Sequence, residues 1–171
     1  MRKNTSGFTI VELLIVIVVI GILAAIVIVA YNGVQTRANN TKSMAAVNSW
    51  AKAIQLYRAD KGTFPTSNSC LGSTTTYNGD GTCWDGTYWV VQAAFLTEMS
   101  PYISNKPEPD LTPVDGTYTQ RRGAFYYVAS ATDHQIRVML SGTNTCPPSS
   151  AGPIAATTVQ SKGVICQYQL D

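Results

Sequence analysis

The sequence has little charge and a single histidine. Charged residues make up 13% of its 171 residues, about half of the share in an average soluble protein, and the net charge is +2. This composition excludes a strongly basic nucleic-acid binder and a highly charged disordered chain. A metal site built from several histidines is excluded because His134 is the only one. We expect neither a cofactor nor a nucleic-acid site.

Charge is missing altogether from one long segment near the N-terminus. No charged residue lies between Glu12 and Arg37, and the run from Leu13 to Tyr31 is apolar apart from glycine. About 20 apolar residues in a helix span the hydrocarbon core of a bilayer. A buried helix is rarely apolar on all sides for so long, and the apolar region of a signal peptide is shorter. The run predicts a membrane helix, and Arg2 and Lys3 before it predict a cytoplasmic N-terminus.

Glu12 is the acidic residue just inside the start of this apolar segment. A carboxylate in a membrane helix is costly, so such a residue is a candidate functional residue by default. A second explanation is an acid in the first helical turn, where the positive end of the helix dipole stabilises it. The residues alone leave both explanations open.

The segment from Gly7 to Ile17 reads Gly-Phe-Thr-Ile-Val-Glu-Leu-Leu-Ile-Val-Ile and resembles the type III signal of type IV pilins and related pseudopilins. In that pattern a short basic leader ends in Gly, Phe follows, and Glu is the fifth residue after the cut. The leader, residues 1–7, resembles the type IVa subclass. Val29 stands where many members of the family carry a helix-breaking proline.

This resemblance implies a processing and assembly pathway. A prepilin peptidase would cut between Gly7 and Phe8 and methylate the new amine of Phe8. The chain would stay in the cytoplasmic membrane as a single-pass protein until an assembly ATPase and an inner-membrane platform protein extract it into a homopolymeric helical filament at the cell surface. Glu12 would then pair with the Phe8 amine of a neighbouring subunit and set the register of assembly. Surface adhesion is expected, and twitching motility and DNA uptake are family possibilities.

The helix signal continues beyond the apolar run. Apolar residues recur at spacings of three and four and predict a stripe that packs on a sheet: Met44, Val47, Trp50, Ile54 and Tyr57. Lys61 precedes Gly62, a preferred C-terminal cap, and Pro65 prevents the helix from resuming. We therefore expect one helix of about 50 residues that ends near Lys61.

Three strand-like runs lie in the second half of the chain, at Ala124–Val128, Gln135–Leu140 and Val164–Tyr168. The first two flank a predicted hairpin turn at residues 131–134, and the segment from Ser141 to Gly163 is expected to be a surface loop. The predicted fold class is α+β, with the C-terminal half of the long helix packed on an antiparallel sheet of three or four strands.

The predicted domain organisation has four parts. A leader (1–7) precedes the apolar half of the helix (8–31), its amphipathic half (32–61) and a globular head (62–171). Residues 91–99 could form a short helix within the head.

Four cysteines allow three pairings, and in an exported chain they are expected to form disulfides. Pairing of sequence neighbours, Cys70 with Cys83 and Cys146 with Cys166, would close short loops. The second of these disulfides would resemble the disulfide-bounded region of pilins. Zinc is disfavoured because the chain has no Cys-x-x-Cys. A calcium loop of the EF-hand type that began at Asn78 would require Gly at its sixth position and Glu at its twelfth, but the sequence has Cys83 and Trp89 there, so no metal site is expected.

Other chemistry-bearing residues give weak signals. We interpret His134 as a solvated turn residue and Arg121 and Arg122 as a solvated strand edge rather than a phosphate site. An aromatic group could form a contact surface or pack over the sheet: Trp84, Tyr88 and Trp89. No nucleophile and base stand out, so we expect no catalytic residues and no enzyme activity.

Two alternatives to a pilus subunit remain. The first is a pseudopilin of a type II secretion system, whose N-terminal signal is the same. The second is an enzyme that uses the apolar helix only as a membrane anchor. The absence of a recognisable calcium loop and the two expected disulfides favour the pilus subunit.

Overall fold

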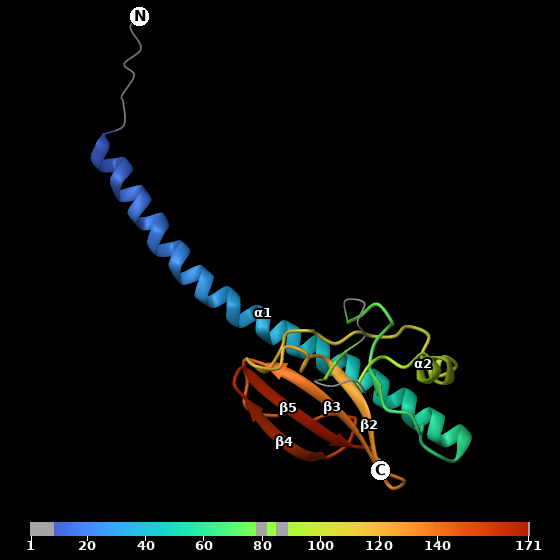
Figure 1. Ribbon diagram of the computed structural model, residues 1–171. Coiled ribbons are helices and arrows are strands. Elements are labelled where there is room, and N and C mark those ends of the chain that lie inside the picture. Colours follow the sequence, from blue (N-terminus) through green and yellow to red (C-terminus); the bar gives the residue numbers. More distant parts are fainter. Residues whose placement is uncertain (1–8, 78–81, 85–88, 171) are drawn as a thin grey trace, which may run out of the picture. The chain divides into compact units, whose positions relative to one another are not determined.

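The computed structural model describes residues 9–77, 82–84 and 89–170 (Figure 1). Contacts divide the chain into two compact units, Met1–Arg37 and Ala38–Asp171. The helix α1 (Ile10–Lys61) has 52 residues and contributes to both units. The other elements belong to the second unit: β1 (Ser69–Cys70), α2 (Ala93–Met99), β2 (Ala124–Ser130), β3 (Asp133–Ser141), β4 (Ile154–Gln160) and β5 (Gly163–Gln169).

The predicted end of the long helix is confirmed. α1 ends at Lys61, and Gly62 follows with a φ angle of 74°. The backbone N–H of Gly62 donates to the carbonyl of Arg58 over 2.8 Å. A left-handed residue of this kind closes a helix without the steric cost that a Cβ would bring.

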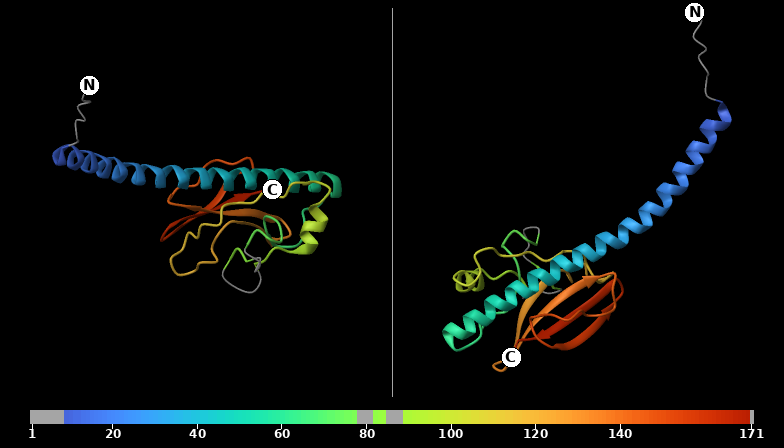
Figure 2. Two further views of the ribbon diagram at one scale, coloured as in Figure 1. Left: turned by 90° about the horizontal axis from the view of Figure 1, so that it is seen from above. Right: turned by 180° about the vertical axis from the view of Figure 1, so that it is seen from behind.

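The apolar stripe of α1 forms the main core, as predicted. The second half of the helix lies across one face of the sheet (Figure 2). Trp50 and Ile54 are completely buried there. The even-numbered residues of β2, β3 and β5 meet them, because alternate side chains of a strand point to the same face.

The opposite face of the sheet carries a second, smaller core. The odd-numbered residues Phe125, Met139 and Ile165 are buried there beneath loop residues that include Tyr77 and Val114. Both faces of the central strands are therefore covered, one by a helix and the other by loops.

The short helix α2 is fixed to the last turns of α1, and its predicted position at 91–99 is nearly right. The hydroxyl of Tyr57 donates to a carboxylate oxygen of Glu98. This hydrogen bond, together with burial, raises the pKa of Tyr57 to about 12. Trp50 adds a second attachment, because its ring stacks on Phe95 at 5.9 Å between centroids.

The α+β class is confirmed, but the sheet is larger than predicted. Five antiparallel strands lie in the order β1-β2-β3-β5-β4. The three predicted strands correspond to β2, β3 and β5, whereas β4 lies inside the segment expected to be a loop. That expectation was wrong because every residue of β4 from Ile154 to Val159 is exposed, so the strand shows no alternation of apolar and polar residues.

Candidate functional site

The first half of α1 presents apolar side chains to all sides. Leu13, Ile17 and Ile20 are 57%, 63% and 58% exposed, and their neighbours are exposed to a similar extent. Within the part of the chain that the structure describes, α1 is the one helix long and apolar enough to cross a membrane. A helix that is hydrophobic all round needs lipid or other protein around it. This segment therefore fits a membrane anchor.

Thr9 and Glu12 form a reciprocal cap where α1 begins. The backbone N–H and the hydroxyl of Thr9 each donate to Oε2 of Glu12 over 2.8 Å. In return, the backbone N–H of Glu12 donates to the Thr9 hydroxyl oxygen over 3.3 Å. Thr followed three residues later by Glu is the capping-box pattern, which satisfies backbone donors that the first turn leaves without acceptors. The structure thus gives Glu12 a local role as a cap.

The residues predicted for processing, Gly7 and Phe8, lie outside the described residues. They come directly before Thr9 in the sequence, so the cap begins one residue after the predicted methylated residue. Thr9 is not among the residues predicted from the sequence. The Thr-x-x-Glu spacing was the signal that could have identified it.

Two disulfides tie the loops of the second unit to its sheet. Cys70 is bonded to Cys83, and Cys146 to Cys166, so the cysteines that are neighbours in the sequence are paired. The first joins β1 to the loop over the smaller core, and the second joins the segment before β4 to the middle of β5. Both therefore fix irregular segments that have few regular backbone hydrogen bonds of their own.

His134 is buried rather than solvated, so its predicted turn position is wrong. The residue is 6% exposed and belongs to β3, because the hairpin turn is shorter than predicted and β3 already begins at Asp133. Its ring stacks on Phe64 with 4.3 Å between centroids. The guanidinium of Arg58 lies 4.4 Å from the centroid of the same Phe64 ring. His134 is therefore part of the packing beside the end of α1.

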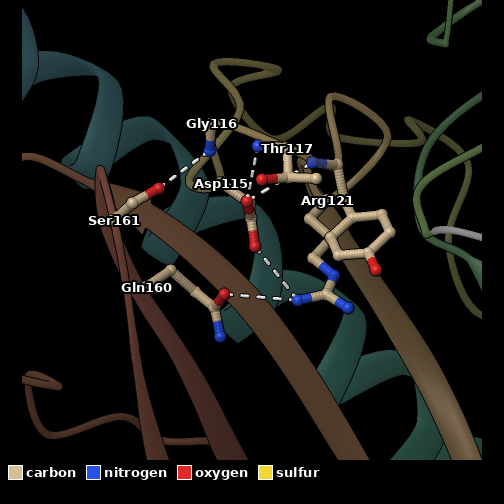
Figure 3. A network of polar contacts seen from close by, with 7 residues as sticks. Asp115, Gly116, Thr117, Arg121, Gln160 and Ser161 are labelled. Carbon is tan, nitrogen blue, oxygen red and sulfur yellow. Dashed lines mark hydrogen bonds and ion pairs between the residues drawn. The ribbon is translucent and has the colours of Figure 1, made fainter.

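Arg121 is not the solvated strand edge that the sequence suggests. It belongs to a polar network between the segment before β2 and the hairpin of β4 and β5 (Figure 3). Its Nη1 lies 3.1 Å from Oδ2 of Asp115 and donates to Oε1 of Gln160 over 3.2 Å. The N–H of Gly116 donates to the hydroxyl of Ser161 over 2.8 Å. The network attaches the loop to the hairpin turn.

Asp115 is the acceptor at the centre of this network, and no sequence pattern marks it as a candidate. The backbone N–H of Thr117 donates to its carboxylate over 2.7 Å. This bond lowers the pKa of Asp115, and the N–H of Tyr118 and the charge of Arg121 lower it further. Arg122 also serves the loops, because its Nε donates to the carbonyl of Thr82 over 3.3 Å. Both arginines therefore hold loops in place.

The aromatic group in the loop packs over the sheet. The rings of Trp84 and Trp89 lie 5.4 and 4.8 Å from the ring of Phe125. Tyr88 lies outside the described residues. Of the two explanations that the sequence left open, packing over the sheet accounts for both tryptophans.

Among residues 9–77, 82–84 and 89–170, no group of three His, Cys, Asp or Glu side chains lies close enough together to hold a metal ion.

The N-terminal segment matches a known family model. Residues 2–28 match the family model of the prokaryotic N-terminal methylation motif. The chain is 37% identical over 79 residues to the fimbrial protein EcpC of Eikenella corrodens. That alignment covers 46% of this chain and 52% of the relative. It is 38% identical over 69 residues to the type IV wide pilus major component PilA4 of Thermus thermophilus. That alignment covers 40% of this chain and 53% of the relative.

A third relative belongs to a secretion system. The type II secretion system core protein G of Aeromonas hydrophila is 31% identical over 70 residues, covering 41% of this chain and 49% of the relative. The chain thus spans about half the length of these curated relatives. No solved structure matches the chain significantly. The names describe structural proteins rather than enzymes, and the predicted resemblance to type IV pilins and pseudopilins is confirmed.

Proposed function

We propose that this chain is a pilin, the structural subunit of a type IV pilus-like filament. The observation that carries the proposal is the methylation motif at residues 2–28, which leads into a helix whose first half is apolar and exposed on all sides. The fimbrial and pilus relatives support the same assignment.

In this proposal the apolar half of α1 has two successive environments. Lipid surrounds it while the protein is a single-pass membrane protein with its N-terminus in the cytoplasm. Neighbouring copies of the same helix surround it in the filament, where side-chain packing replaces lipid contacts. An ATPase and a membrane platform protein drive the transfer, and the second unit, Ala38–Asp171, becomes the outer surface and mediates adhesion.

Processing by a prepilin peptidase precedes assembly. We propose cleavage between Gly7 and Phe8 and methylation of the Phe8 amine. Cleavage removes Arg2 and Lys3, the positive charges that hold the leader in the cytoplasm. The capping box then starts at the second residue of the mature chain.

Mass spectrometry of the N-terminus tests this proposal. The full chain is expressed with and without a prepilin peptidase, and surface fibres are sheared and counted. We expect mature protein that begins at a singly methylated Phe8, and fibres only when the peptidase and the assembly machinery are present. Gly7→Leu should block cleavage because a bulky side chain enters the scissile position, whereas Ser6→Leu serves as the matched control. Fibres built from uncleaved chains would contradict the proposal.

A second candidate is a pseudopilin of a type II secretion system, favoured by the similarity to secretion core proteins G. Deletion of the gene in its own host distinguishes the two. Loss of surface fibres with normal protein secretion supports the pilus subunit, and loss of secretion with unchanged fibres supports the pseudopilin.

A further inference from the structure

The two edges of the sheet differ in how they are protected. β1 has two residues, both buried, and the N–H of Cys70 donates to the carbonyl of Val90 in the adjoining loop over 3.1 Å. A short edge that a loop covers cannot template another strand. β4 forms the opposite edge with seven residues, of which six are exposed.

The side chains of β4 do not protect its edge either. No Lys, Arg, Asp or Glu lies between Arg137 and Lys162. The strand reads Ile-Ala-Ala-Thr-Thr-Val-Gln, and Ile154 and Val159 are 44% and 57% exposed. Charged side chains are the usual means by which a sheet edge avoids pairing with another chain, and β4 has none.

Most of β4 pairs regularly with β5. A bulge between Ile154 and Ala156 interrupts the pairing with β5, but Ala156 to Gln160 pair residue by residue. The Cys146–Cys166 disulfide lies against this part, since the Thr157 hydroxyl contacts Sγ of Cys146 at 3.4 Å.

The far end of β4 is anchored as well. Gln160 accepts a hydrogen bond from Arg121, whose charge is paired with Asp115 (Figure 3). The edge is therefore ordered before any partner arrives, which reduces the entropy cost of pairing.

We propose that the β4 edge pairs antiparallel with β4 of a second copy of this chain. In an antiparallel ladder, every second residue directs its backbone N–H and C=O away from the strand with which it is already paired. The outer edge of β4 therefore offers hydrogen-bond donors and acceptors that an extended segment of another chain can satisfy. Ala156–Gln160 is the regularly paired part of β4. When two copies of this segment pair with Thr158 on the two-fold axis, threonine faces threonine, Thr157 faces Val159, and no like charges meet because the segment carries none.

The symmetry of this contact determines which copies it joins. An antiparallel pair of identical strands is isologous and has a two-fold axis, whereas a helical filament repeats a head-to-tail contact. If the chain is a filament subunit, as proposed above, the β4 pair joins subunits of two different filaments. One contact of this size is weak, but two filaments that lie side by side form many such contacts at once, and the overall affinity between them is then much higher. The β4 edge would then bundle the fibres laterally.

Photo-crosslinking tests the contact in bundled fibres. The photoreactive amino acid p-benzoylphenylalanine is placed at Thr158 of the full chain in sheared fibres, and at exposed Thr132 in the hairpin of β2 and β3 as the control. We expect a crosslinked dimer from position 158 alone, with the link mapped to residues 154–160 of the second copy. A link to another protein, a link to another part of the chain, or no link would overturn the proposal.

Charge variants test the bundling itself. Thr158→Lys and Thr158→Glu each place like charges face to face and should reduce the bundled fraction of sheared fibres by about fivefold. Fibres of the two variants mixed together should bundle again, because opposite charges then meet. Thr132→Lys should bundle like the wild type. Wild-type fibres that stay single, or bundling that Thr158→Lys leaves unchanged, would overturn the inference, whereas a complete absence of fibres would count against the proposed function.

Discussion

Thr9 and Glu12 hold each other at the start of α1 through three hydrogen bonds, two of them 2.8 Å long. The pair gives Glu12 a function inside its own chain, in addition to the proposed contact with the Phe8 amine of a neighbour. A cap needs a hydrogen-bond acceptor at this position, whereas the contact between subunits needs a negative charge. Substitutions can separate the two roles.

The first prediction uses Glu12→Gln and Thr9→Ala as a matched pair. Gln preserves the capping box without the charge, and Ala at position 9 removes the cap while Glu12 keeps its charge. If the charge drives assembly, Glu12→Gln should abolish most fibres with normal membrane insertion and leader cleavage. Thr9→Ala should retain most fibres. Fibre counts beside a blot for processed protein measure both, and normal fibre numbers from Glu12→Gln would show that Glu12 acts only as a cap.

The second prediction concerns the Cys146–Cys166 disulfide. Replacing both cysteines by serine removes a crosslink over 20 residues, which is worth about 3 kcal/mol in the chain-entropy model. We expect lower thermal stability of the second unit and new proteolytic cleavage between Ser141 and Gly163. Limited proteolysis with peptide mapping measures this. Matched replacement of Cys70 and Cys83 should instead expose the loop over the smaller core. Cleavage sites that do not change would contradict the prediction.

The third prediction concerns Trp50 in the main core. Its side chain is completely buried, and its indole N–H donates to the carbonyl of Pro107 over 3.0 Å. Trp50→Ala should reduce the free energy of unfolding by about 3–5 kcal/mol, because it leaves a cavity and an unsatisfied carbonyl. Chemical denaturation followed by circular dichroism measures the loss. Lys52→Ala, on the exposed side of the same turn, should change little.

The fourth prediction concerns acid stability and Asp115. The folded protein lowers the pKa of this carboxyl, so its contribution is fully present above the pKa of the unfolded chain and is lost as the pH falls through the folded value. Wild-type stability should therefore decrease on the acid side, below about pH 4. Asp115→Asn should be less stable at neutral pH and should show a shallower decrease in acid. Melting temperatures between pH 2 and pH 7 test this, and parallel curves for both proteins would contradict it.

Several features could be predicted from the sequence alone because they depend on residues close together in the chain. The apolar run after Glu12 determines the membrane-compatible helix. The stripe that contains Trp50 and Ile54 marks the core face, and Gly62 with Pro65 marks the helix end. Each follows from helical periodicity or backbone conformation, which a partner elsewhere in the chain does not change.

Other features were decided only by tertiary structure. β4 lacks alternation because neither of its faces is covered, so only its pairing with β5 makes it a strand. His134 is buried because the chain places Phe64 against it, and Arg121 finds Asp115 and Gln160 through the fold of a loop. These contacts join residues distant in sequence, and the free energy that selects them comes from packing and hydrogen bonding that no local pattern encodes.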